Sequence, residues 1–255
     1  MDAFGLVIVG NEILDGRVRD RHVQNAREVL AARDLRLAYV LVLPDDPDVL
    51  TDHLRWAMAR PEPFFCCGGI GSTPDDYTRQ CAARAAGVPL AFHEEGVAIL
   101  KERFGPDANP ERLRMAEFPQ GAALIPNPVN RVSGFRIGNG HFLPGFPNMA
   151  RPMMAWVVEN DYPRGSPRAR AALVLPGARE ADLVPLMDLF IAGHPALSFS
   201  SLPRYTPQGG TEIELGIAGS PDNVQAGLRD LKELLADNNV VFNTEDTIAE
   251  RQSEI

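Results

Sequence analysis

The chain has 255 residues, of which 45% are hydrophobic and 23% charged, and its formal net charge is −9 at pH 7. This composition is that of a globular protein with one or two domains and excludes a largely disordered chain. The negative charge argues against nucleic acid or an anionic membrane surface as a partner, because both would be repelled.

No targeting or membrane signal is visible at the level of the sequence. The first residues lack the basic start and continuous apolar segment of a secretory signal, and no apolar run reaches the roughly 20 residues that span a bilayer. We therefore expect a cytoplasmic protein without a membrane partner. The cysteines show no C-x-x-C spacing, and the adjacent Cys66 and Cys67 are expected to be buried thiols in a strand.

Three strand–helix units open the chain. Apolar, β-branched runs predict strands, and apolar residues at helical spacing predict the helices between them. The strands are expected at 3–10, 36–43 and 64–67, and the helices from about 20, from 47 to before 61, and from about 74 to 86. Asn11–Gly16 is expected to be a polar connection. This alternation predicts a doubly wound parallel sheet, in which the connections after the first three strands line one ligand site.

The remainder of the first domain is predicted to be mixed. A polar helical segment over 94–117, interrupted at 105–110, is expected to be a lid or flank. Short strands follow, and a helix over 149–159 closes the domain. The strands are expected at 122–125, 134–137 and 141–143.

The domain organisation follows from composition. We expect residues 1–160 to form the first domain, 161–169 a linker, 170–243 a smaller α+β domain and 244–255 a polar tail. The second domain is predicted to have the order βαββαβ, ending in a strand at 240–242. That order fits the split ferredoxin-like arrangement, and a looser α+β pair remains the alternative.

The most informative stretch begins after the third strand. Gly68, Gly69 and Gly71 permit a turn whose backbone N–H groups converge on an anion such as phosphate. Ser72 and Thr73 add two hydroxyls. A helix that begins just beyond them would aim its positive end at the same place.

The same stretch has a purely structural interpretation. Thr73 as N-cap, Pro74 at the first helical position and Asp76 three residues after the cap resemble a capping box. Capping alone does not explain three glycines and a second carboxylate, so the sequence favours a ligand loop.

Carboxylates beside a phosphate site repel the ligand unless a cation lies between them. Asp75 and Asp76 in the loop, together with Asp45 and Asp46 after the second strand, therefore suggest Mg²⁺ held by carboxylates and phosphate oxygens. A helix that starts at Pro47, with Asp46 and Asp48 merely flanking its first residue, explains part of this cluster equally well.

Basic residues follow the first strand. Arg17, Arg19, Arg21 and His22 could neutralise a phosphate or lie on a solvated helix start, and the sequence alone leaves both open.

At this point the motifs resemble a known family. Gly68–Thr78 resembles the G-G-x-G-x-T-x-D-D-x-T signature of the molybdopterin-binding domain of molybdopterin adenylyltransferases, gephyrin and competence/damage-inducible protein A. Gly10–Gly16, Arg114–Ala122 and Leu143–Pro147 are similar to further motifs of the last group. The matches run in order over 4–155.

The resemblance implies a three-layer αβα fold with the ligand on the glycine loop, and a homo-oligomer, dimer or trimer. In the adenylyltransferases two aspartates serve Mg²⁺-dependent transfer of AMP to molybdopterin, and their positions match Asp45 and Asp76. Competence-type proteins have been assigned ADP-ribose pyrophosphate hydrolysis with a metal. Glu12, Pro144 and Gly145 fall in motifs that the resemblance places at the ligand site.

The chain departs from the family pattern at Val9, Asn11, Ser72 and Asn130, where Thr, Asp, Pro and Gly are usual in relatives. It also has Arg21 and His22 where a Thr–Asn pair is common. The pocket for pterin or base is therefore expected to differ. The matched span does not include the amidase domain of longer competence proteins, so amide hydrolysis is not expected.

The sequence thus predicts a protein that binds a pterin phosphate or nucleotide, with Mg²⁺-dependent phosphoanhydride chemistry. The enzyme would be a nucleotidyltransferase or a pyrophosphatase. The alternative is a non-catalytic protein that binds or delivers molybdopterin or a nucleotide.

Overall fold

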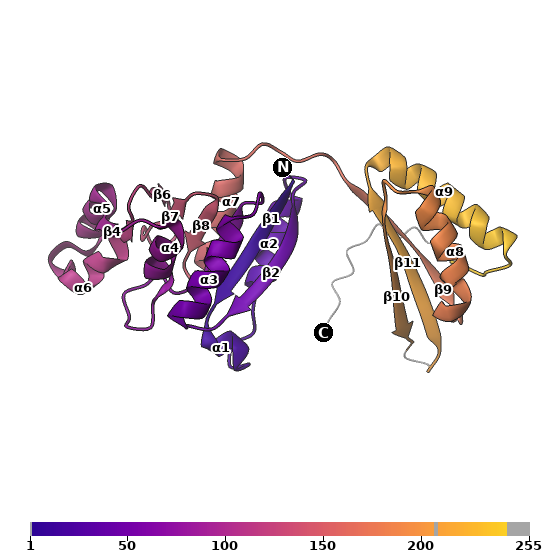
Figure 1. The fold of residues 1–255 in the computed structure, drawn as a ribbon, viewed down its shortest axis with the longest axis horizontal. Helices are drawn as coiled ribbons and strands as arrows, with labels where there is room; N and C mark the ends of the chain where they lie inside the picture. Colours follow the sequence, from indigo (N-terminus) through magenta and orange to yellow (C-terminus); the bar gives the residue numbers. More distant parts are fainter. Residues whose placement is uncertain (1, 207–208, 244–255) are drawn as a thin grey trace. The chain divides into compact units, whose positions relative to one another are not determined.

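The computed structural model describes residues 2–206 and 209–243 and divides into two compact units, Met1–Gly165 and Ser166–Ile255 (Figure 1). The boundary lies inside the expected linker, 161–169. Residues at the start of that segment nevertheless contact the first unit, since Arg33 Nη2 donates to the Tyr162 carbonyl (3.1 Å) and Arg164 pairs with Asp34 (2.8 Å). The expected polar tail, 244–255, lies outside the described residues.

The first unit is built on a six-stranded sheet of order β2-β1-β3-β8-β7-β6. The first four strands in that order are parallel, and β7 is antiparallel to both of its neighbours. The strands are β1 (Ala3–Val9), β2 (Arg36–Leu43), β3 (Phe64–Cys67), β6 (Ala123–Ile125), β7 (Gly134–Ile137) and β8 (Gly140–Leu143). The predicted strands therefore exist, with boundaries within two residues of those expected.

Every residue of β1 is buried, because its side chains alternate between two hydrophobic cores. Phe4, Leu6 and Ile8 enter one core, and Val7 and Val9 enter the other. Burial on both faces explains why β1 is a continuous apolar run in the sequence.

Helices cover both faces of the sheet. The first core is closed by α2 (His22–Ala31) and α7 (Pro147–Asn160), and the second by α3 (Pro47–Met58) and α4 (Thr78–Ala86). This three-layer αβα architecture, visible in Figure 1, confirms the predicted fold class. The connection at 11–16, which was expected to be polar, contains a short helix, α1 (Asn11–Leu14).

The segment expected as a lid or flank forms a small helical extension. It comprises α5 (Glu94–Phe104), the 3₁₀ helix η1 (Gly105–Asp107), α6 (Pro110–Leu113) and the 3₁₀ helix η2 (Arg114–Ala116). Two strands that the sequence did not reveal, β4 (Leu90–Phe92) and β5 (Glu117–Pro119), pair in antiparallel orientation at its base. Three-residue strands are too short for a periodic signal.

The second unit is a three-stranded antiparallel sheet with two helices on one face. Its elements are β9 (Ala169–Pro176), α8 (Glu180–Gly193), β10 (Ser198–Tyr205), β11 (Thr211–Gly219) and α9 (Pro221–Asp237). The predicted last strand at 240–242 is wrong. In the described part of the chain, only an isolated bridge between Asn243 and Val174 extends the sheet beside β9, where the fourth strand of a split ferredoxin-like sheet would lie.

Among the described residues, no helix is long and apolar enough to cross a membrane.

Candidate functional site

The site lies at one edge of the sheet, where four neighbouring parallel strands end together. The register pairs Val9 with Leu43, Ile8 with Cys67, and Cys67 with Leu143. The residues that follow these strands therefore meet, as expected at the carboxyl ends of an α/β sheet.

The first two connections are joined by hydrogen bonds. The Asn11 N–H donates to Asp45 Oδ2 (2.8 Å), and the Asp45 N–H donates to Asn11 Oδ1 (3.4 Å). The Glu12 side chain of α1 lies against Gly10 at the end of β1. A Cβ at Gly10 would lie only 2.6 Å from Glu12 Oε1. Glu12 and Asp45 thus lie at one end of the site.

The glycine loop is joined to the fourth connection. The Gly68 N–H donates to the Leu143 carbonyl (3.0 Å), and a Cβ at Gly145 would lie 3.3 Å from Gly68 Cα. Pro144 beside it is half-buried. The predicted ligand residues Gly68, Pro144 and Gly145 are therefore in one place.

The loop itself depends on a left-handed residue. Gly69 has φ +65°, and a Cβ there would overlap the Thr78 hydroxyl oxygen. Its carbonyl accepts the Thr78 N–H (2.9 Å), which fixes the start of α4. The prediction that the helix begins near Pro74 is therefore wrong by four residues.

The expected capping box at Thr73 is a separate turn. The Thr73 N–H and hydroxyl both donate to Asp76 Oδ2, at 2.8 and 2.5 Å, and the Asp76 N–H donates back to the Thr73 carbonyl (3.1 Å). Gly71 packs closely against this turn, since a Cβ there would lie 2.6 Å from Asp76 Oδ2 and would displace the carboxylate. Asp76 shapes the loop as well as offering a carboxylate, while Ser72 is half-buried and Asp75 is exposed.

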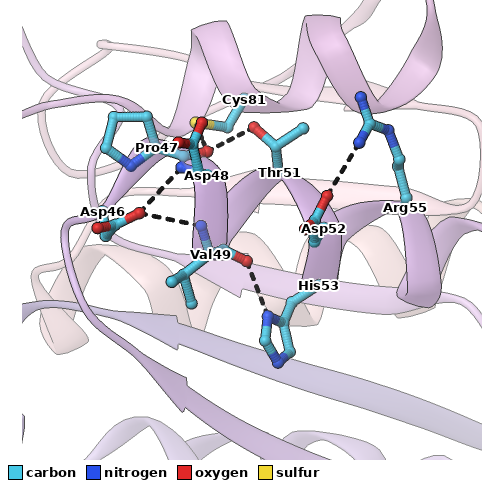
Figure 2. A network of polar contacts seen from close by, with 9 residues as sticks. All are labelled: Asp46, Pro47, Asp48, Val49, Thr51, Asp52, His53, Arg55 and Cys81. Atoms are coloured by element: carbon cyan, nitrogen blue, oxygen red, sulfur yellow. Dashed lines mark hydrogen bonds and ion pairs between the residues drawn. The ribbon is translucent and has the colours of Figure 1, made fainter.

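Figure 2 shows the contacts that Asp46 makes at the start of α3. Asp46 is the N-cap of α3, and its Oδ1 accepts the N–H groups of Asp48 and Val49, both at 3.0 Å. The Pro47 carbonyl accepts from Thr51 and from the Cys81 thiol of α4. The structural interpretation of Asp46 is therefore correct, and Asp45 remains as the site carboxylate of this connection.

The carboxylates of the three connections influence one another. Burial raises the pKa of Asp45, the Asn11 N–H lowers it, and the charges of Glu12, Asp75 and Asp76 raise it further. Among the described residues, no three His, Cys, Asp or Glu side chains form a group that could hold a metal ion by themselves. A cation here would therefore depend on the oxygens of a ligand as well as on the protein.

Two buried polar residues at the start of α4 were missed by sequence reasoning. Thr78 is fully buried and its hydroxyl has no hydrogen-bond partner. Arg79 is 2% exposed, and its Nη2 donates to the Gly71 carbonyl (2.8 Å). An arginine on a helix is ordinarily a surface residue, so the sequence gave no indication that Arg79 is buried.

The basic residues after β1 separate into two groups. Arg17, Arg19 and Arg21 are exposed, as expected of a solvated helix start. His22 is buried, donates from Nε2 to the Gly145 carbonyl (3.1 Å) and has an unpaired Nδ1. Burial lowers its pKa, so it supports the fourth connection as a neutral side chain.

Asn130, which stands where relatives have glycine, fits its turn without backbone strain. Asn130 Oδ1 accepts the Val132 N–H (2.9 Å), and the left-handed residue of this turn is Arg131, with φ +64°. A glycine at 130 is therefore not required by the backbone here.

The first unit matches the model of a known protein family. The family described as a probable molybdopterin binding domain matches residues 5–164, which is more than half of the chain and almost all of the first unit. The chain belongs to the molybdopterin-binding domain family. The predicted resemblance is confirmed.

Relatives extend this finding. A protein of Pyrobaculum arsenaticum is 32% identical over 253 residues, covering 91% of this chain and 92% of the relative. A CinA-like protein of Geobacter sp. is 34% identical over 191 residues, covering 71% of this chain but 46% of the relative. The chain thus spans less than half of that longer relative.

A solved structure supports the fold of this molybdopterin-binding domain. The CinA protein of Thermoplasma acidophilum, described as having unknown function, has a TM-score of 0.58 and 28% identity. The match covers 62% of this chain and 97% of that one. The similarity therefore concerns a span comparable in length with the first unit.

Proposed function

We propose that the first unit binds a pterin phosphate or a nucleotide at the Gly68–Thr73 loop and catalyses Mg²⁺-dependent phosphoanhydride chemistry. The observation that carries the proposal is the convergence of the glycine loop with Asp45, which lies within electrostatic range of Glu12, Asp75 and Asp76. Family membership supports a pterin-related ligand.

The donor set fits Mg²⁺ in a particular way. Mg²⁺ is commonly held by one or two carboxylates together with substrate phosphate oxygens and water. Asp45 and Asp76 would supply the carboxylates, with exposed Asp75 nearby. The loop N–H groups between Gly68 and Thr73 would bind phosphate, since those of Gly68 and Thr73 already donate to the Leu143 carbonyl and to Asp76 Oδ2. The ion would offset charge that develops in adenylyl transfer or pyrophosphate hydrolysis.

The test is a panel of reactions with Mg²⁺. Purified protein is incubated with ATP plus molybdopterin, with ADP-ribose and with related pyrophosphates, and product formation is measured. For whichever reaction proceeds, Asp76→Asn and Asp45→Asn should each lower the rate by about tenfold or more, because a metal ligand is lost.

Asp46→Asn is the matched control for Asp45→Asn. The two residues are adjacent and lose the same charge, but asparagine still caps α3. A rate as low in Asp46→Asn as in Asp45→Asn would contradict the assignment of Asp45.

A non-catalytic binding or delivery protein is the second candidate. It is favoured by the departures from the family pattern at Val9, Asn11, His22, Ser72 and Asn130, which alter the expected pocket for pterin or nucleotide. Retained ligand binding with no turnover across the panel would replace the enzyme proposal with this one.

A further inference from the structure

A buried arginine lies behind the glycine loop. Arg79 is the second residue of α4 and is 2% exposed. Its Nη2 donates to the Gly71 carbonyl at 2.8 Å, so this loop carbonyl is turned toward the guanidinium in the protein interior. The guanidinium therefore fixes the orientation of the Gly71 carbonyl within the loop.

The other side of the guanidinium is held by the helical extension. Arg79 Nη1 donates to the carbonyl of Arg114 and to that of Glu117 (3.3 Å). These residues belong to the Arg114–Ala122 motif, for which sequence analysis had no role in the site. The planar guanidinium thus connects the glycine loop with the junction of η2 and β5.

The charge of Arg79 is incompletely compensated. Its nearest carboxylate, Glu117, lies 4.0 Å from Nη1, and its Nε has no partner. Burial lowers its pKa, while Glu117 and Asp76 raise it. A cation in the interior is screened less than one in water, so its field extends to the loop.

The positive charge of Arg79 affects the repulsion between the carboxylates of the site and a phosphate ligand. The connections around the loop carry the negative charges of Glu12, Asp45, Asp75 and Asp76, which act on one another. Phosphate brings further negative charge to the same place. A fixed cation behind the loop offsets part of this repulsion, whether or not a metal ion is bound.

We propose that Arg79 is a positioning residue of the phosphate site: it turns the Gly71 carbonyl away from the ligand, supplies fixed positive charge, and couples loop occupancy to the 114–117 segment. The proposal rests on the proposed function of the loop as a phosphate site. If Arg79 had a purely structural role, its substitution would destabilise the fold but would not change the affinity of the loop for phosphate. Ligand binding would then also leave the 114–117 segment unchanged.

The test uses inorganic pyrophosphate as the probe, without metal and at constant ionic strength. Its dissociation constant is measured by calorimetry for the wild type, Arg79→Met and Arg79→Lys. Arg84→Met is the control, because Arg84 is an exposed arginine in the last turn of the same helix. Each variant is first shown to be folded by the fluorescence of Trp56 and Trp156.

We expect Arg79→Met to raise the dissociation constant by about tenfold or more, since a charge-assisted hydrogen bond and a charge are lost. Arg79→Lys should fall between it and the wild type, because lysine keeps the charge but cannot span both sets of carbonyls. Arg84→Met should bind as the wild type does.

Amide hydrogen exchange at 114–117 provides the second measurement. Pyrophosphate should slow exchange there in the wild type but not in Arg79→Lys, which covers the case in which Arg79→Met does not fold. Unchanged affinity in both Arg79 variants, or ligand-dependent slowing that persists in Arg79→Lys, would overturn the inference and leave the proposed function intact. Absence of pyrophosphate binding to the wild type with Mg²⁺ as well as without it would overturn both.

Discussion

Gly69→Ala tests whether the loop conformation is fixed by close packing on α4. Gly69 has φ +65°, where an L-residue costs about 1–2 kcal/mol. A Cβ at this position would also overlap the Thr78 hydroxyl and lie 3.2 Å from Thr78 Cβ. Overpacking of this kind costs about 1–3 kcal/mol more.

A matched control separates the two contributions. Gly87 ends α4 with φ +70°, and a Cβ there would meet nothing within 4 Å. Gly87→Ala should therefore cost only the backbone penalty of about 1–2 kcal/mol, whereas Gly69→Ala should cost about 2–5 kcal/mol. Adding Thr78→Ala to Gly69→Ala should recover much of the difference, because it removes the overlapping oxygen.

The free energy of unfolding is measured in urea by tryptophan fluorescence. The chain has two tryptophans, Trp56 and Trp156, and both lie in the first unit, so the signal reports that unit alone. If Gly69→Ala costs no more than Gly87→Ala, or if Thr78→Ala fails to reduce its cost, the loop is not fixed by this contact.

Three further outcomes are expected. Asp46→Ala should lower the free energy of unfolding by about 1 kcal/mol through loss of the α3 cap, while Asp46→Asn should cost little, as urea titrations will show. Burial lowers the pKa of His141 to about 4, below the ordinary 6.5, so its neutral form is favoured in the folded state and stability is full above pH 6.5. Stability should then fall by about 2 kcal/mol between pH 7 and pH 5 from this residue, and the fall should shrink in His141→Gln; an unchanged pH dependence would exclude His141 as its source. All three cysteines are buried, and burial raises the pKa of each thiol, so native protein should not react with a thiol reagent such as DTNB, and rapid labelling without denaturant would contradict the packing of Cys66, Cys67 and Cys81.

Predictions from the sequence were most accurate where one local signal dominates. β2 and β7 have the expected boundaries because their apolar runs are bounded by charged residues or turns. Asp46 caps α3 as its position before a proline suggested. The last strand, expected at 240–242, was wrong because a short apolar run cannot show whether it finds a sheet edge to pair with.

The glycine loop shows where local reasoning reaches its limit. Thr73 and Asp76 can form a helix cap or a turn with nearly the same contacts, and the sequence does not distinguish them. The choice depends on the Thr78 N–H, which bonds to the Gly69 carbonyl and delays the helix. That bond needs the left-handed conformation of Gly69, which the surrounding structure imposes.

The sequence by itself determined the layered fold, the family, and the glycine loop with its aspartates, because periodicity, glycine content and residue order are local properties of the chain. The tertiary structure decided which of those aspartates caps a helix, where α4 begins and which cation lies behind the loop. Buried Arg79 finds carbonyl acceptors in the 114–117 segment. Contacts between residues more than 30 positions apart carry no signal in a single sequence.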